Sequence, residues 1–329
     1  MAIPEKRLAL RLGFVDLPDE RRKHRGIRSR LGGPGMFLAF LAGLLASRQP
    51  LDAKLLGVLL GSALCIAIGL VDDKRQPFRH ELGALPQLFG QLAAAGLAIA
   101  AGVSILAVRD PRALGPFGGL LQLPLAISIP LTLAWITGMI NTVNFLDGMD
   151  GLATGVVAIG AAVLAVASLR LGQPAVALQC LALAGAAVGF LPHNLPPARL
   201  FMGTTGAWFL GYALATLSII GGAKLSTALL VIGVPVFDVA LLIVLRTRRG
   251  QPFWQADRSH LFHRLLDVGL SHRTTLVLYY CLSAAFGAYA LAFTTVQSSG
   301  WGLKIYGLAG LLAVTIFILA FLARTNARR

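Results

Sequence analysis

Residues 55–71 read LLGVLLGSALCIAIGLV and contain no charged side chain. A helix of about 20 such residues crosses the hydrocarbon core of a bilayer. Similar runs recur along the chain, in which 56% of residues are hydrophobic and 13% are charged. The sequence therefore predicts an all-α polytopic transmembrane helical bundle of about ten spans, near 31–48, 51–71, 85–106, 124–143, 151–169, 175–192, 204–220, 225–245, 274–294 and 302–323.

These runs exclude a soluble helical protein, because ten such helices leave no set of polar faces to cover them. We expect residues 1–329 to form a single integral membrane domain. Its longer extramembrane parts are expected at 1–30 and 246–273, which are polar and rich in arginine. The cysteines all lie inside apolar runs without a CxxC spacing, so they indicate packing residues rather than disulfides or a zinc site.

Basic residues are concentrated in alternate loops. Of 29 Lys and Arg residues, 22 lie in residues 1–30, 72–80, 193–203, 246–273 and 324–329. The positive-inside rule places these loops in the cytoplasm. The net charge of +15 suits anionic membrane lipids and phosphorylated substrates. No nucleic-acid-binding motif accompanies it, so we expect no nucleic-acid partner.

Polar and titratable side chains gather at the same ends of the predicted spans. The loops assigned to the outside have almost none beyond Asp52 and Asp110. Charge bias and reactive groups therefore select the same face, which predicts a catalytic or binding surface on the cytoplasmic side. Its candidate residues are Asp72, Asp73, Asn141, Asn144, Asp147, Asp150, His193, Asn194, Asp238, Asp257, His260 and His263.

Asp72 and Asp73 end an apolar run. Adjacent carboxylates at a membrane boundary are costly unless they are paired or metal-bound, and carboxylate oxygens suit Mg²⁺ that also contacts substrate phosphates. The other interpretation is a solvated helix end, neutralised by Lys74 and Arg75. In both cases we expect the two aspartates at a wet boundary.

Asn141, Asn144, Asp147 and Asp150 recur every three residues between two long apolar runs. On a helix this spacing drifts slowly around one face. Such side chains have no role facing lipid, so they indicate a binding site. The alternative is a structural hydrogen-bond network between helices.

The loop at 257–264 reads DRSHLFHR. His260 and His263 share a helical face if this segment is helical, and Arg258 offers a phosphate contact. Phosphate or nucleotide binding is favoured over a metal site, because no third ligand has a fixed spacing. The remaining interpretation is a basic loop that touches lipid head groups.

Asp238 lies within an apolar run, after Pro235. An intramembrane carboxylate suggests function by default. It is equally compatible with a purely structural partner for a nearby arginine such as Arg246. The sequence does not choose between these.

These motifs, in this order, resemble the polyprenyl-phosphate N-acetylhexosamine-1-phosphate transferases, glycosyltransferase family 4. The resemblance spans nearly the whole chain. It is greater to the branch of undecaprenyl-phosphate GlcNAc-1-phosphate transferases than to the related phospho-MurNAc-pentapeptide translocase. The stretches that carry it are 30–33, 72–73, 144–151, 201–203 and 257–264.

The resemblance implies a membrane enzyme of cell-envelope polysaccharide biosynthesis. A UDP-sugar, expected to be UDP-GlcNAc, would give its sugar 1-phosphate to undecaprenyl phosphate and release UMP. The implied cofactor is Mg²⁺, with Mn²⁺ as an alternative. The implied location is the bacterial inner membrane, with the active site on the cytoplasmic face.

The resemblance also implies residue roles. Asp72 and Asp73 are the expected catalytic pair at the reacting phosphates. Asp147 and Asp72 are the expected metal ligands. The expected substrate-binding residues are Asn144, Asp147, Asp150, Arg258, His260 and His263.

Two departures from the family leave alternatives open. Thr204 stands where the family has an aspartate that ligates metal. The sequence begins in the basic loop that follows the first family span, so we expect either that this span is absent or that the start of the chain is misassigned. A catalytically impaired relative that binds lipid or donor is one alternative. A transporter or flippase is another, and association as a homodimer is left open.

Overall fold

The computed structural model describes residues 13–16, 28–75, 82–109, 120–220, 224–248, 250, 260–294 and 301–326. Helices account for most of them, and the strands form two short antiparallel ribbons. In chain order the elements are β1 (Val15–Asp16), β2 (Arg28–Ser29), α2 (Gly32–Ala46), α3 (Ala53–Arg75), α4 (Ala84–Ala100), β3 (Ala107–Arg109), β4 (Leu120–Gln122), α5 (Leu125–Leu146), α6 (Leu152–Arg170), α7 (Pro174–Asn194), α8 (Gly203–Ile219), α9 (Leu225–Val231), α10 (Gly233–Arg248), α11 (Leu261–Asp267), α12 (His272–Ala292) and α13 (Trp301–Asn326).

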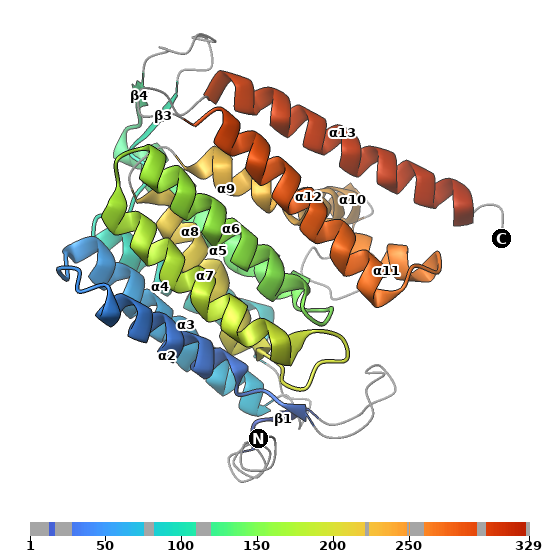
Figure 1. The fold of residues 1–329 in the computed structure, drawn as a ribbon, viewed down its shortest axis with the longest axis horizontal. Helices are drawn as coiled ribbons and strands as arrows, with labels where there is room; N and C mark the ends of the chain where they lie inside the picture. Colours follow the sequence, from blue (N-terminus) through green and yellow to red (C-terminus); the bar gives the residue numbers. More distant parts are fainter. Residues whose placement is uncertain are drawn as a thin grey trace.

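The helices lie side by side as a bundle (Figure 1), which confirms the predicted all-α polytopic fold. Each predicted apolar run coincides with a helix or a helix pair. Among the described residues, five helices, α3, α5, α6, α7 and α12, are long and apolar enough to cross a membrane alone. The predicted run 225–245 is broken, because α9 and α10 are bent by 83° relative to each other. Counting that pair as one gives six.

Helix α8 is the centre of the bundle. Nearly every residue along it is buried, and it packs against α2, α3, α5, α6, α7 and α9. Its start lies very close to α3, since a Cβ added to Gly69 would be 2.4 Å from the Cα of Thr205. This close approach places the last turn of α3, which carries Asp72 and Asp73, against the first turn of α8.

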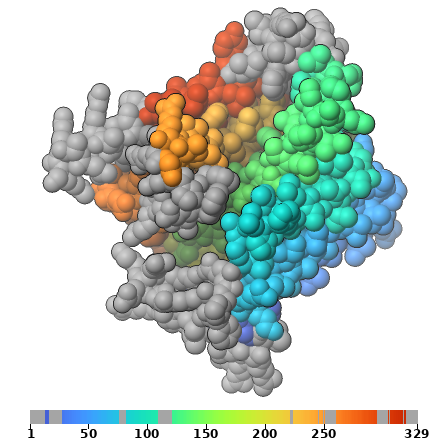
Figure 2. All heavy atoms as spheres, turned by 180° about the vertical axis from the view of Figure 1, so that it is seen from behind, coloured from blue at the N-terminus to red at the C-terminus, as the bar shows by residue number. Residues whose placement is uncertain are grey.

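The outer faces of the helices are apolar. Figure 2 shows α4 and α5 at the surface of the bundle. Large exposed side chains there include Leu88 and Phe89 on α4 and Ile127 and Leu131 on α5. Exposed apolar area of this extent is typical of a surface that faces lipid. The chain is therefore a multi-pass helical membrane protein.

Candidate functional site

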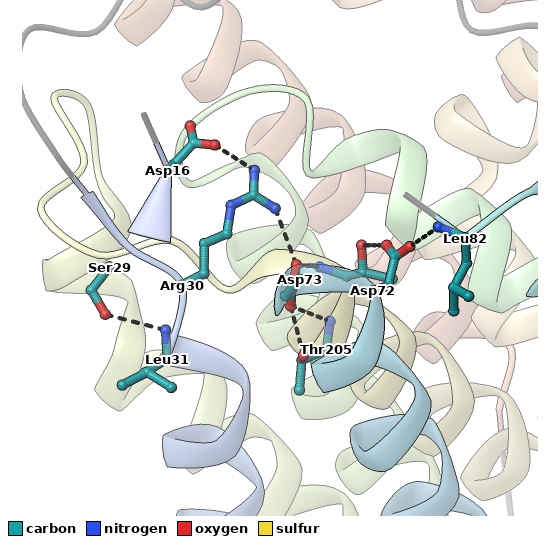
Figure 3. A network of polar contacts seen from close by, with 9 residues as sticks. Asp16, Ser29, Arg30, Leu31, Asp72, Asp73, Leu82 and Thr205 are labelled. Carbon is teal, nitrogen blue, oxygen red and sulfur yellow. Dashed lines mark hydrogen bonds and ion pairs between the residues drawn. The ribbon is translucent and has the colours of Figure 1, made fainter. Parts of the chain in front are cut away.

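Asp73 receives hydrogen bonds from four donors on two other segments (Figure 3). Its Oδ1 accepts from the backbone N–H of Thr204 at 3.0 Å and from Arg30 at 3.1 Å. Its Oδ2 accepts from the backbone N–H and the hydroxyl of Thr205, at 3.0 and 2.6 Å. Helix N-termini have unpaired N–H groups and a positive dipole end. Asp73 therefore caps α8 from a different helix.

Gly203 makes this cap possible. It has a φ of +65°, and an added Cβ would be 2.3 Å from Oδ2 of Asp73. A side chain at this position would be strained and would also collide with the carboxylate. The glycine before Thr204 thus allows Asp73 to reach the first amides of α8.

Asp72 points in a different direction and has fewer partners. Its Oδ1 accepts from the backbone N–H of Leu82 at 2.8 Å, and its Oδ2 accepts from the Thr204 hydroxyl at 2.7 Å. Each oxygen keeps a lone pair for a further ligand. The expectation of a wet boundary is wrong for both aspartates: Asp72 is 3% exposed and Asp73 is fully buried. The packing of α3 on α8 covers them.

The N-terminal segment brings a guanidinium to the same place. Phe201 donates its backbone N–H to Ser29, and Gly32 donates its own to Phe201, so the chain around Arg30 is fixed beside the start of α8. Arg30 bridges Asp73, at 3.1 Å, and Asp16, at 2.9 Å. Burial opposes its charge, but these carboxylates outweigh burial and raise the pKa of Arg30.

Asp16 was missed at the sequence level. It lies in a polar segment that carried no motif, 14 residues before its partner. Only the antiparallel pairing of β1 with β2 brings it to Arg30. The basic stretch 1–30 also contains Glu5, Asp19 and Glu20, so the sequence has no signal that singles out Asp16.

The turn between α5 and α6 carries Asp147 and Asp150. The Asp150 carboxylate accepts from the backbone N–H of Ala198 at 2.9 Å. Asn194 accepts from the Gly151 N–H and from the Thr154 hydroxyl, at 3.1 and 2.8 Å. These bonds fasten the loop after α7 to this turn, so Asp147 is presented by a fixed scaffold.

The side chain of Asp147 has no hydrogen bond within the part of the chain that the structure describes, although its backbone N–H donates to Val143. Burial raises the pKa of its carboxyl well above the usual range; the Arg30 charge opposes this, and the Asp73 and Asp150 carboxylates add to it. These influences place Asp147 in the field of the Arg30–Asp73 pair. A carboxyl of this kind favours an approaching cation.

The asparagines before this turn differ in their surroundings. Asn141 forms a reciprocal amide pair with Gln91 of α4, with N–O distances of 2.8 and 3.1 Å. This pair joins α4 to α5, so Asn141 belongs to a hydrogen-bond network between helices, which was the alternative to a binding role. Asn144 is partly buried one turn later, near the end of α5.

The segment that bears His260 and His263 packs against the same turn. The ring of His260 lies 5.1 Å from that of Phe145, and an added Cβ on Gly148 would be 2.8 Å from Phe262. His263 follows on α11, with its ring 4.2 Å from that of Phe262. Arg258 and Asp257 lie outside the described residues. Of the predicted site residues that are described, the structure thus places His260 beside the segment that bears Asn144 and Asp147.

Residues 55–222, about half of the chain, match the model of glycosyl transferase family 4. This chain belongs to that family. The resemblance stated from the motifs is confirmed, and so is the expectation of an enzyme that transfers a sugar 1-phosphate.

Relatives of this family 4 transferase are similar over most of its length. A Bacillus subtilis protein named probable undecaprenyl-phosphate N-acetylglucosaminyl 1-phosphate transferase is 34% identical, over 87% of this chain and 79% of its own length. The decaprenyl-phosphate N-acetylglucosaminephosphotransferase of Mycobacterium tuberculosis is 36% identical, over 88% of this chain and 78% of its own length. A phospho-N-acetylmuramoyl-pentapeptide-transferase of Staphylococcus haemolyticus is 42% identical over 40% of this chain and 44% of its own length.

The carboxylates of this transferase fit a Mg²⁺ ion that is bound jointly by the protein and by substrate phosphates. Within the described ranges, no group of three His, Cys, Asp or Glu side chains is arranged to hold a metal. Mg²⁺ is commonly bound by one or two carboxylates together with waters and substrate phosphates. Asp72 keeps lone pairs, the Asp147 carboxylate has no hydrogen bond among the described residues, and Asp73 already accepts from four donors. Asp72 and Asp147 therefore each have carboxylate oxygens left for a cation that substrate would help to bind.

We expect Asp147→Asn to make the transferase more heat-stable at neutral pH. A carboxyl with a raised pKa destabilises the folded state when it ionises, and this loss appears as pH rises through its folded-state pKa. Asparagine does not titrate, so the stability gain of the variant should grow with pH and vanish in acid. Thermal unfolding in detergent between pH 4 and 9 measures it; a gain that is equal at all pH values would contradict the assignment.

Proposed function

We propose that this chain transfers GlcNAc 1-phosphate from UDP-GlcNAc to undecaprenyl phosphate and releases UMP. The observation that carries the proposal is the gathering of carboxylates from α3 and the α5–α6 turn around the buried Arg30. The names of the similar proteins supply the donor sugar and the type of acceptor. Such a site suits a reaction between two phosphorylated substrates.

The chemistry exchanges one diphosphate linkage for another. An oxygen of the lipid phosphate forms a bond to the β-phosphorus of the donor, and the bond from that phosphorus to the UMP oxygen breaks. Little driving force is needed, so catalysis depends on positioning and on charge neutralisation. The protein residues must therefore orient two phosphates and keep their charges balanced.

Local charge is the reason for proposing a metal. Asp16, Asp73, Asp147 and Asp150 act electrostatically on a region in which, among the described residues, Arg30 is the cation that acts on Asp147. Anionic phosphates cannot enter such a region without a further cation. When bound, Mg²⁺ would neutralise phosphate oxygens, and Asp72 and Asp147 would hold it; Mn²⁺ is the alternative ion.

The contacts favour different roles for the two adjacent aspartates. We propose that Asp72, with lone pairs facing no donor, acts at the reacting phosphates. Asp73 accepts from four donors, which suits a residue that fixes Arg30 and the start of α8. Donor binding is proposed for Asn144, Asp147 and Asp150, and phosphate binding for Arg258, His260 and His263.

We also propose ten membrane spans in the bacterial inner membrane, with the site facing the cytoplasm. The loops that carry 22 of the 29 basic residues support this orientation. In Figure 1 the ribbon of β3 and β4 lies at the end of the bundle opposite β1 and α11. In intact cells, an impermeant thiol reagent should therefore label a single cysteine at 110 and should not label one at 76.

The decisive assay measures UMP release by the purified full-length chain in detergent. It uses a panel of UDP-sugars, with and without undecaprenyl phosphate, and with Mg²⁺, Mn²⁺ or EDTA. We expect release with UDP-GlcNAc that requires both the lipid and the metal. Absence of release with every donor would favour the impaired relative, and movement of lipid across vesicles without UMP would favour a flippase.

We expect Thr204→Asp to lower the Mg²⁺ concentration that gives the half-maximal rate. The Thr204 hydroxyl donates to Asp72 at 2.7 Å, so an aspartate here would place a second carboxylate beside the first. Two carboxylates attract a divalent cation more strongly than one carboxylate and a hydroxyl. Thr204→Val, which removes the hydroxyl without adding charge, is the control. An unchanged Mg²⁺ requirement in Thr204→Asp would place position 204 away from the metal.

A further inference from the structure

Asp238 and His260 form a buried pair that the proposed reaction does not yet use. Oδ2 of Asp238, on α10, lies 3.0 Å from Nδ1 of His260, which precedes α11. The backbone N–H of Leu261 donates to the other oxygen, Oδ1, at 3.1 Å. The two side chains are only 7% and 11% exposed. Both carboxylate oxygens are thus committed to the segment that begins α11.

The carboxylate decides which nitrogen of His260 carries a proton. An ionised carboxylate only accepts hydrogen bonds, so Nδ1 must be the donor in this pair. In a neutral ring the lone pair is then on Nε2, and in a charged ring Nε2 also donates. Within the described part of the chain, Nε2 has no hydrogen-bond partner and is not among the buried atoms that lack one. Nε2 is therefore the nitrogen left for a ligand.

Aromatic rings hold the imidazole in place. Phe145 lies 5.1 Å from it at an interplanar angle of 32°, and Phe262 lies 6.0 Å away, nearly parallel at 8°. Phe145 is two residues before Asp147, and Phe262 contacts the position of Gly148. The ring is consequently fixed against the turn that presents the proposed donor-binding aspartate.

Within the described part of the chain, the titratable groups near the pair include Tyr279 and His263. Tyr279 of α12 is buried within the electrostatic influence of Asp238. The ring of His263, on α11, lies 4.2 Å from that of Phe262 and is tilted by 38°. Neither Tyr279 nor His263 forms a hydrogen bond with His260. The His260 ring is hydrogen-bonded to Asp238.

We propose that Asp238 is a positioning residue that acts through His260, holding Nδ1 protonated so that Nε2 faces a phosphate oxygen of the bound substrates. This role rests on the proposed function. It resolves the ambiguity at Asp238, because its partner is a histidine of the site and the contact is specific to one ring nitrogen. It also explains why a carboxylate is present in the apolar first part of α10.

The kinetic test is a double-mutant cycle with UDP-GlcNAc and undecaprenyl phosphate. We expect Asp238→Asn to lower kcat by about 10- to 100-fold, the usual effect of losing a residue that orients a histidine. In the His260→Ala background, Asp238→Asn should cause no further loss, because its effect passes through the missing ring. Asp267→Asn, an exposed carboxylate on α11, is the control and should keep the native rate. Losses that multiply in the double variant would overturn the proposal.

A second measurement does not depend on turnover. Nitrogen NMR of the ¹⁵N-histidine-labelled chain reports which ring nitrogen carries the proton, and the His260→Ala spectrum identifies the signal. We expect protonation at Nδ1 in the native chain and a shift away from it in Asp238→Asn. A native chain that shows this signal but releases no UMP would refute the function and not the pair. An unchanged tautomer in Asp238→Asn would refute the positioning role itself.

Discussion

Asp72→Asn should lower the rate of UMP release by at least about 100-fold, the scale of losing one charge-stabilising group at a reacting centre. The fold should survive the change. An asparagine can still accept from the N–H of Leu82 through its oxygen, and its amide can donate to the Thr204 hydroxyl once that hydroxyl rotates. Both contacts are kept while the negative charge is lost. Initial rates and thermal unfolding of the same preparation separate the two effects.

Asp52→Asn is the matched control, because it removes a carboxylate from the opposite end of the same helix. Asp52 is exposed and caps α3 by accepting from the Leu55 N–H at 2.7 Å, and asparagine is an equally good cap. Its rate should stay native. Asp73→Asn should instead lose stability, since an amide donor would face the donors that Asp73 now accepts. A native rate in Asp72→Asn would remove Asp72 from the mechanism.

Arg30→Met should destabilise the protein by about 3 kcal/mol or more, the range measured when one partner of a buried ion pair is removed. Arg30 is 8% exposed, and its guanidinium joins Asp16 to Asp73. Methionine fills similar space but leaves two buried carboxylates without their cation. Part of the loss should disappear in acid, where the carboxylates are protonated.

Arg75→Met provides the control, since Arg75 is an exposed arginine at the end of α3. Exposed substitutions usually change stability by less than about 0.5 kcal/mol. Chemical unfolding in detergent at pH 7 and pH 5 compares the variants. If Arg30→Met is as stable as Arg75→Met, the Arg30 bridge contributes nothing to the fold.

The helical membrane fold could be predicted because it depends on local composition. A stretch such as 55–71 has only one stable state in a bilayer, and ten such stretches leave little choice of fold class. The break between α9 and α10 has a weak local signal, because Pro235 lacks a backbone N–H and can kink a span, although 225–245 otherwise reads as one apolar run. The family could be recognised because its motifs keep their order.

The site could be predicted only as a list of residues at one face. Which aspartate of the pair at 72–73 receives the α8 amides depends on how α3 turns against α8, and composition does not encode that rotation. The same holds for Asp16, whose partner is chosen by the ribbon of β1 and β2. The sequence left Asp238 open between a functional role and a structural contact with an arginine such as Arg246. In the structure its partner is His260.

The cap that Asp73 provides for α8 has a consequence for biosynthesis. The amides that it accepts from lie 131 and 132 residues later in the chain. At about 5–20 residues per second, the ribosome needs roughly 7–26 seconds to make that stretch. During this interval Asp73 has Arg30 but not the α8 amides, and an incompletely paired carboxylate favours the hydrated interface over the hydrocarbon. The end of α3 is therefore expected to stay at the membrane surface during synthesis, and Asp73 becomes buried only after α8 has inserted.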